Sequence, residues 1–283
     1  MSEKTTQSIR QAEQKLVGEF KALGPLPNFT GDEIIVMRCA ETMPEVFPDW
    51  LNRSELDEKR YVPFDLNVPI ELPIRAQMRK SYEIDPPITE AGKVCARMTA
   101  RELKQRKMIP KTIFCSPDFA SVETAAQIAA RLGETCGKIR IEPELSSFLK
   151  GNEFFFKKDE LKGLGYPLDD VTPFSASKTS TTYAETVNRI KKVFYELIAP
   201  VPNALIIVDP LSMMIISSFF YPIKLKKESS IELERLKSLD SVGSLANFAI
   251  FRQGVTGMKM YDLTNVTLRP LTFTGFSNDI EFD

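Results

Sequence analysis

The sequence contains no histidine in 283 residues. Imidazole is the side chain that most often serves as a general base near neutral pH, and it is the usual partner of serine and cysteine nucleophiles. Its absence excludes Ser-His-Asp hydrolysis, Cys-His proteolysis, zinc sites of the H-E-x-x-H type and reactions through a phosphohistidine. Any chemistry of this chain must therefore use other side chains.

Cysteine is also scarce, and the charges nearly cancel. Cys39, Cys95, Cys115 and Cys136 are scattered along the chain, which is typical of free thiols and not of a disulfide framework. The 37 basic and 38 acidic residues leave a net charge of −1, so the overall charge gives no reason to expect a nucleic acid or a membrane as a partner. No cysteine pair has the spacing of zinc ligands, and we expect neither a metal nor a cofactor.

Long uninterrupted apolar runs are missing too. The first residues contain no apolar core of a signal peptide, so we expect a cytoplasmic protein, with the nucleus as the alternative. Residues 204–223 are about long enough to span a bilayer, but Asp209 and Pro210 interrupt them. A charge followed by a helix breaker predicts a buried strand, a turn and a buried helix there instead.

Short apolar runs bounded by turns alternate with longer helical patterns. Runs of isoleucine and valine without polar alternation predict strands covered on both faces, as in a parallel sheet between layers of helices. Strands are predicted at residues 34–37, 112–115, 139–142, 204–208, 248–251 and 258–262, and helices at about residues 89–106, 121–132, 158–163, 183–198 and 211–219. The last two strands predict an antiparallel hairpin at an edge. The expected fold class is α/β, a three-layer αβα sandwich with a mostly parallel sheet of about six strands.

Two further segments complete the expected organisation. Residues 5–23 place apolar side chains at helical spacing, so residues 1–30 are predicted to form an amphipathic helix and a linker ahead of a domain of residues 31–283. This helix packs on its own domain or docks on a partner. A segment rich in proline and charge, at about residues 44–87, predicts a long insertion above the strand ends, where the sites of α/β proteins form.

Several phrases occur in a recognisable order: MRCAET after a predicted strand, then YVPFDLNVPIELPIR, DPPITEAGKVCAR, IFCSPDFASVETAAQIAARL, IEPEL and ALIIVDPLS. In content and order they resemble the histidine phosphatase (phosphoglycerate mutase-like) superfamily, from about residue 33 to residue 262. The likeness is closest to the TULA/Sts phosphatase domains and the ecdysteroid-phosphate phosphatases, which share the D-L-N-x-P and D-P-P-[IL]-[ST] phrases. The resemblance implies the phosphoglycerate mutase-like fold and allows a homodimer.

The resemblance also implies a set of catalytic positions, and this chain departs from the family at them. In the family motif R-H-G-E-R the histidine is phosphorylated and the arginines neutralise phosphate, whereas residues 38–42 read RCAET here. The family also has a phosphate-clamping arginine, an acid that protonates the leaving group and a second histidine. These three positions correspond to Ala120, Ser147 and Pro210.

Cys39 and Thr42 thus replace a histidine and an arginine, and Arg38 is retained. We therefore predict a catalytically inactive protein, a pseudophosphatase, that acts on an unknown protein partner as a scaffold or regulator. Arg38 is expected to pair with a neighbouring carboxylate such as Glu41, or else to hold a lone anion. Cys39 is expected to be a small buried thiol, or else a nucleophile whose pKa Arg38 lowers. The alternatives are a weak or altered phosphatase and a sensor of a phosphorylated ligand.

Pro210 puts a rigid apolar residue where the family needs a mobile and solvated one. Phe119, Phe148 and Leu211 lie in or beside the same motifs. Together these residues predict a cleft that has become apolar or closed.

Overall fold

The computed structural model describes residues 31–147, 152–171, 182–201, 203–220, 234, 237–239, 242–253 and 257–263. In these ranges, six strands form one sheet in the order β3-β2-β4-β1-β5-β6. The amphipathic helix predicted for residues 5–23 lies outside the described residues, and its prediction stays untested.

The sheet is parallel except at one edge. Its strands are β1 (Ile34–Arg38), β2 (Thr112–Cys115), β3 (Ile139–Ile141), β4 (Ala204–Val208), β5 (Asn247–Gln253) and β6 (Gly257–Asp262). β1 pairs in parallel with β4, placing Ile34 opposite Ala204, and β2 continues the parallel part between β4 and β3. β5 runs antiparallel to β1 and forms a hairpin with β6. The predicted sheet and its antiparallel edge are confirmed.

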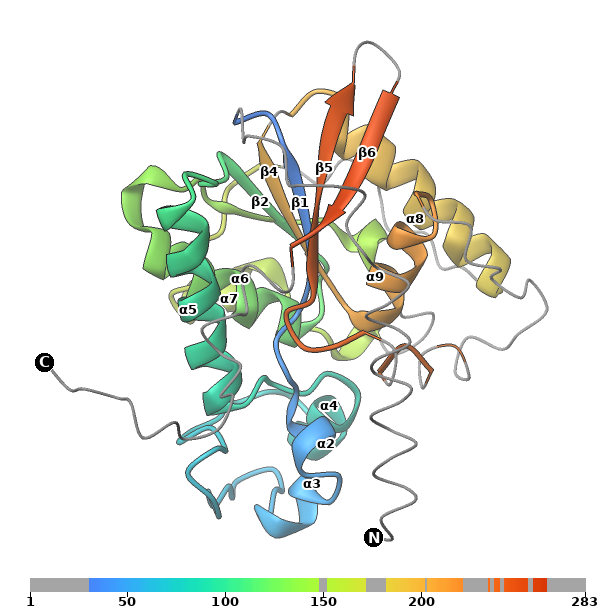
Figure 1. Cartoon of the computed structure of the whole chain (residues 1–283). Helices are drawn as coiled ribbons and strands as arrows, with labels where there is room; N and C mark the ends of the chain where they lie inside the picture. Colours follow the sequence, from blue (N-terminus) through green and yellow to red (C-terminus); the bar gives the residue numbers. More distant parts are fainter. Residues whose placement is uncertain are drawn as a thin grey trace, which may run out of the picture.

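Helices cover both faces of the sheet (Figure 1). The described helices are α2 (Met43–Val46), α3 (Trp50–Arg53), α4 (Met78–Ile84), α5 (Glu90–Gln105), α6 (Phe119–Leu132), α7 (Lys158–Gly163), α8 (Tyr183–Ile198) and α9 (Pro210–Ser217), with single turns η1 (Gly133–Thr135), η2 (Pro143–Leu145) and η3 (Asn152–Phe154). None of these helices combines the length and the apolar character needed to cross a bilayer.

The central strand shows why two layers of helices are needed. Successive side chains of a strand point to opposite faces, and all five residues of β1 are buried. Ile35 and Met37 therefore pack in one apolar cluster with α5 and α6, while Ile34 and Val36 pack in another with α8 and α9. This arrangement confirms the three-layer αβα sandwich.

Acidic residues at the ends of two parallel strands begin the helices that follow. Asp118 Oδ2 accepts a hydrogen bond from Ser121 N at 3.0 Å, and Asp209 Oδ1 accepts one from Leu211 N at 3.1 Å. Such side chains satisfy amide groups that have no partner within the helix. α6 and α9 consequently begin slightly earlier than the predicted starts at Ser121 and Leu211.

The predicted insertion at residues 44–87 is a packed segment with helices of its own. It contains α3, α4 and nearly all of α2, and it lies beyond the carboxyl end of β1 (Figure 1). Trp50 and Tyr82 are buried within it, with their ring centroids 6.3 Å apart in an edge-to-face arrangement. This segment forms one wall of the site described next.

Candidate functional site

The carboxyl ends of β1, β2 and β4 meet at one edge of the sheet, beside a cavity of about 190 Å³. Cys39 follows β1, Asp118 and Ala120 follow β2, and Asp209 and Pro210 follow β4; all five line the cavity. Parallel α/β sheets bind their ligands at this end of the strands. The cavity therefore lies where the sequence predicted the site.

Four of the residues that line the cavity are acidic: Glu83, Asp85, Asp118 and Asp209, which we call the acidic wall. None of the described lining residues is a lysine or an arginine, and Asp85, Asp118 and Asp209 are each at most 4% exposed. The other lining residues are Cys39, Thr42, Pro44, Ile84, Pro86, Ala120, Pro210, Leu211, Ser238 and Leu239.

The cleft is not closed, because a cavity remains. Its exposed surface is mainly apolar, as expected, although four acidic residues are among those that line it. Leu211 does line the cavity, but Phe119 packs in the core, with its ring centroid 4.8 Å from that of Phe156. Phe148 lies outside the described residues.

Most of the predicted site positions come together, with two exceptions. Those that line the cavity are Cys39, Thr42, Ala120 and Pro210. Ser147 does not line it: its hydroxyl donates to Asp209 Oδ1 at 2.5 Å, and its amide donates to Asp209 Oδ2 at 3.0 Å. Arg38 does not line the cavity either.

Arg38 is buried and paired with Glu45. Its Nη2 forms an ion pair with Glu45 Oε1, and its side chain is 2% exposed. The other oxygen of Glu45 accepts hydrogen bonds from the amide and the hydroxyl of Thr42, at 2.7 and 2.9 Å. Glu41, the partner suggested by the sequence, instead accepts a bond from Thr89 Oγ1 at 2.6 Å. The expected ion pair exists, but the named carboxylate was wrong.

The environment of Cys39 does not activate its thiol. Burial raises the pKa of Cys39 well above its ordinary value, and Arg38 lowers it by less. The carboxylates of Asp118, Glu45 and Asp209 raise this pKa further. The thiol is therefore protonated at neutral pH, and the lowered pKa that a nucleophile needs is absent.

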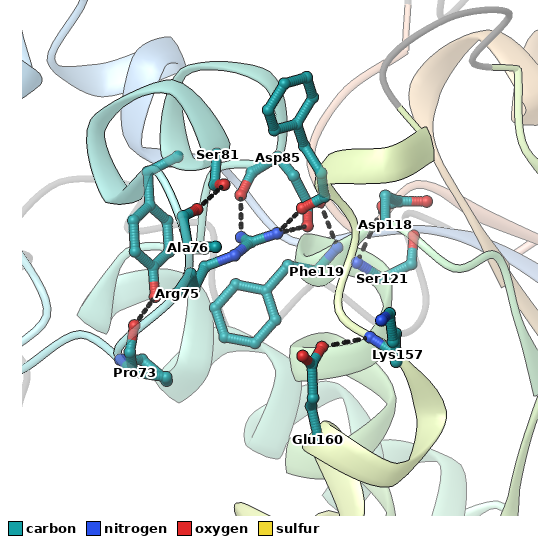
Figure 2. A network of polar contacts seen from close by, with 12 residues as sticks. Pro73, Arg75, Ala76, Ser81, Asp85, Asp118, Phe119, Ser121, Lys157 and Glu160 are labelled. Carbon is teal, nitrogen blue, oxygen red and sulfur yellow. Dashed lines mark hydrogen bonds and ion pairs between the residues drawn. The ribbon is translucent and has the colours of Figure 1, made fainter. Parts of the chain in front are cut away.

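Arg75 and the backbone of Phe119 hold the carboxyl group of Asp85 (Figure 2). Asp85 Oδ2 accepts a hydrogen bond from Arg75 Nη2 at 2.9 Å, and Oδ1 accepts one from Phe119 N at 2.6 Å. The Arg75 guanidinium lies 4.0 Å from the ring centroid of Phe156 and 4.9 Å from that of Tyr82. Burial raises the pKa of Asp85 to about 7, although the charge of Arg75 opposes this shift.

Asp118 and Asp209 lie just beyond the carboxyl ends of the neighbouring strands β2 and β4. Burial, together with the neighbouring carboxylate of Asp209, raises the pKa of Asp118 to about 6. Asp209 accepts hydrogen bonds from both the amide and the hydroxyl groups of Ser147 and Ser212, and from the amide of Leu211. Both carboxylates are thus held by the protein's own donors. Within the described ranges, no group of three or more Cys, Asp and Glu side chains is suited to hold a metal ion.

Comparison with known proteins identifies relatives. No family model matches the chain. Over 143 residues it is 32% identical to the ubiquitin-associated and SH3 domain-containing protein A of Mus musculus, covering 48% of this chain and 23% of that protein. Over 177 residues it is 31% identical to the corresponding protein B of Homo sapiens, covering 59% and 27%. The matches thus span about a quarter of the length of these curated relatives.

A solved structure decides the fold. The ecdysone phosphate phosphatase of Bombyx mori, in complex with tungstate, superposes with a TM-score of 0.62 at 21% sequence identity. The match covers 78% of this chain and 89% of that one. This chain has the histidine phosphatase fold. Both parts of the resemblance noted in the sequence are confirmed: the fold, and the likeness to the TULA/Sts and ecdysteroid-phosphate phosphatase proteins.

Within this histidine phosphatase fold, sequence reasoning missed most of the acidic wall. Glu83 and Asp85 come from the end of α4, a helix that was not predicted. Asp118 and Asp209 carried a usable signal, because each stands between a predicted strand and a predicted helix, where aspartate is a favoured helix cap. Parallel strands bring such positions to one edge of the sheet.

The buried carboxyl groups predict an unusual dependence of stability on pH. The pKa is raised to about 7 for Asp85 and for Glu123, and to about 6 for Asp118, in each case mainly by burial. The folded chain therefore binds more protons than the unfolded chain between about pH 4 and pH 7. These extra protons stabilise the folded state. Their contribution to the free energy of unfolding is complete below pH 4 and is lost as the pH rises through 6 and 7. We expect the free energy of unfolding, measured with urea, to be lower at pH 8 than at pH 5 by at least about 2 kcal/mol.

A neutral variant tests the source of this pH effect. Glu123 Oε2 accepts a hydrogen bond from Ile88 N at 2.8 Å, and the amide oxygen of Glu123→Gln can keep it. This variant should reduce the difference between pH 5 and pH 8, chiefly by raising stability at pH 8. Stability that stays level or increases from pH 5 to pH 8 would rule out this account.

Proposed function

We propose that this chain is a catalytically inactive protein with the histidine phosphatase fold, a pseudophosphatase, that acts as a protein-binding scaffold or regulator. The observation that carries the proposal is the acidic wall of the cavity, formed by Glu83, Asp85, Asp118 and Asp209. At an effective dielectric constant of about 20, two like charges about 6 Å apart repel by roughly 3 kcal/mol. The Asp85 charge is already offset by Arg75, but a phosphate dianion in this cavity meets such repulsion from Asp118 and Asp209, and no lysine or arginine is among the described lining residues.

The individual family positions support the same proposal. The reaction implied by the resemblance needs a nucleophile, cations around phosphate and an acid for the leaving group. Cys39 takes the place of the nucleophile with a raised pKa, and Arg38 is neutralised by Glu45. Ala120 carries no charge, and Ser147 donates its hydroxyl hydrogen to Asp209. Loss of one preorganised charge-stabilising group costs about a hundred- to a thousandfold in rate, and here all three roles are affected.

A role through protein contacts is supported by apolar side chains in the segment between α3 and α4. Leu66, Ile70 and Ile74 are 99%, 81% and 87% exposed. Exposed apolar groups that gather on one part of a surface are typical of protein-binding sites. The helices on either side of this segment are packed on each other through the buried rings of Trp50 in α3 and Tyr82 in α4.

An activity assay tests the absence of catalysis. We expect the purified chain to hydrolyse p-nitrophenyl phosphate no faster than its Arg38→Ala and Cys39→Ser variants between pH 5 and pH 8. Circular dichroism of each variant checks that it is folded. Turnover by the unaltered chain that either substitution abolishes would refute the proposal and favour a weak or altered phosphatase.

Binding of oxyanions separates a scaffold from a sensor of phosphorylated ligands. A ligand that binds only the folded chain must raise its melting temperature. We expect phosphate, vanadate and tungstate to leave the melting temperature unchanged, because Arg38 is paired and the cavity is acidic. An increase that Arg38→Ala removes would replace the scaffold by the sensor.

A further inference from the structure

The ion pair of Arg38 and Glu45 lies next to the cavity of the candidate site, and the carboxylate is its more exposed partner. The side chain of Arg38 is 2% exposed, whereas that of Glu45 is 19% exposed. Thr42 lines the cavity, and its hydroxyl donates a hydrogen bond to Glu45 Oε2 at 2.9 Å. Pro44, the residue before Glu45, lines the cavity as well. Removal of the Glu45 side chain is therefore expected to open the Arg38 guanidinium to solutes.

The local structure of α2 explains only half of the contacts that this carboxylate makes. Glu45 Oε2 accepts a hydrogen bond from the Thr42 amide at 2.7 Å, as the third residue of a helix commonly does in a capping box. Glu45 Oε1 instead accepts a hydrogen bond from Arg38 Nη2, at the end of β1. Helix capping does not require this second contact. The carboxylate is thus held by groups of two separate elements, as an anionic ligand would be.

The carboxylate uses only part of the Arg38 guanidinium. The Nε and Nη2 groups of an arginine lie on one edge and form a fork that can bind two oxygens of an anion. In Arg38, Nη2 donates to Glu45, whereas Nε is buried and has no hydrogen-bond partner among the described residues. A carboxylate has two oxygens, and Thr42 already holds one of those of Glu45. A tetrahedral oxyanion has more oxygens, so it can bind both groups of the fork and the Thr42 hydroxyl at once.

We propose that the Glu45 carboxylate is an internal ligand of an oxyanion site formed by the Arg38 guanidinium and the Thr42 hydroxyl. Once the carboxylate is removed, this site takes a tetrahedral oxyanion, such as a phosphoryl group. Asp118 and Asp209 line the neighbouring cavity, so their negative charge keeps the affinity modest. This inference rests on the proposed function and names a group of the inactive chain that takes the place of a phosphorylated ligand.

Removal of the carboxylate tests the site. The melting temperature of the purified full chain is measured at tungstate concentrations up to about 10 mM, against sodium chloride of the same ionic strength, because a ligand of the folded chain raises this temperature. We expect Glu45→Ala to melt at a lower temperature than the unaltered chain, since Arg38 loses its partner, and tungstate to restore part of the loss. The affinity of Glu45→Ala for tungstate should exceed that of the unaltered chain by at least about tenfold.

A second variant removes the charge and keeps the shape of the side chain. The amide oxygen of Glu45→Gln can still accept the hydrogen bond from the Thr42 amide, so this variant should fold even if Glu45→Ala does not. Its affinity for tungstate should increase by a smaller factor, about threefold, because the amide still fills part of the site. Circular dichroism checks that each variant is folded.

Glu41 provides the matched control. Glu41→Ala changes the net charge by the same amount, but the Glu41 carboxylate accepts its hydrogen bond from Thr89 Oγ1 and not from Arg38. This variant should change the tungstate affinity by less than about twofold. Addition of Arg38→Ala to Glu45→Ala should return the affinity to that of the unaltered chain.

Three results would overturn the internal ligand. The folded Glu45 variants could bind tungstate no more tightly than the unaltered chain, Glu41→Ala could gain as much affinity as they do, or the gain could survive Arg38→Ala. None of these results bears on the proposed function, which depends on whether the unaltered chain hydrolyses p-nitrophenyl phosphate. Failure of the inference and failure of the proposed function are thus observed separately.

Discussion

Replacement of Asp209 with alanine is expected to lower the free energy of unfolding by about 3 to 5 kcal/mol. Its buried carboxylate caps α9 through Leu211 N and Ser212 N, and it also accepts hydrogen bonds from the Ser212 and Ser147 hydroxyls and the Ser147 amide. A buried donor that loses its acceptor costs about 1 to 3 kcal/mol. Relief of the repulsion between Asp209 and Asp118 returns part of this cost. Urea denaturation of the purified variant measures the difference.

An exposed helix cap is the appropriate control. Thr182 caps α8, and its hydroxyl accepts a hydrogen bond from Glu185 N at 3.2 Å at the protein surface. Thr182→Ala should therefore cost no more than about 1 kcal/mol, since water replaces the lost bond. If Asp209→Ala lowers the free energy of unfolding as little as Thr182→Ala does, the structure around the cavity does not depend on the hydrogen bonds of Asp209.

Replacement of Arg75 with methionine is also expected to cost about 3 to 5 kcal/mol, because it leaves the buried carboxylate of Asp85 without its cation. The guanidinium also donates to the Asp85 carbonyl at 3.2 Å and to the carbonyl of Phe154, and it packs on the rings of Phe156 and Tyr82. Without Arg75 the pKa of Asp85 must rise further. The loss in urea denaturation should thus be larger at pH 8 than at pH 5.

A double variant separates the ion pair from the packing. In the Arg75→Met, Asp85→Asn chain, no buried charge is left unpaired, so its stability should be higher than the sum of the two single losses predicts by about 2 kcal/mol. Strict additivity of the two substitutions would mean that the pair contributes only through its separate contacts with Phe119, Phe154 and the aromatic rings.

Local sequence patterns were sufficient to predict the strands of the sheet and the helices that cover it. The apolar runs of β1 and β4 predicted buried strands, because a short strand that is covered on both faces of the sheet must be apolar throughout. The helical spacing in α7 and α8 predicted their ends correctly, since each amphipathic pattern stops where the helix stops. The family resemblance indicated the fold into which these elements are arranged.

The sequence was less informative where chain geometry decides the contacts. The stretch from Pro44 to Pro48 reads as a loop, but proline is favoured in the first turn of a helix, and α2 brings Glu45 back to Arg38. α4 follows Gln77, whose left-handed backbone (φ 49°) redirects the chain, and no sequence pattern announced that change. The acidic wall was missed for a related reason: its carboxylates come from three segments far apart in the sequence.

The position of β1 in the sheet has a consequence for synthesis in the cell. Ile34 leaves the ribosome about 170 residues before its parallel partner Ala204, and β5 follows later still. At a translation rate of about 5 to 20 residues per second, this wait lasts on the order of 10 to 30 s. During that time the apolar β1 has neither of its neighbouring strands. We therefore expect the nascent chain to bind chaperones during this interval, and products truncated before β4 to be degraded.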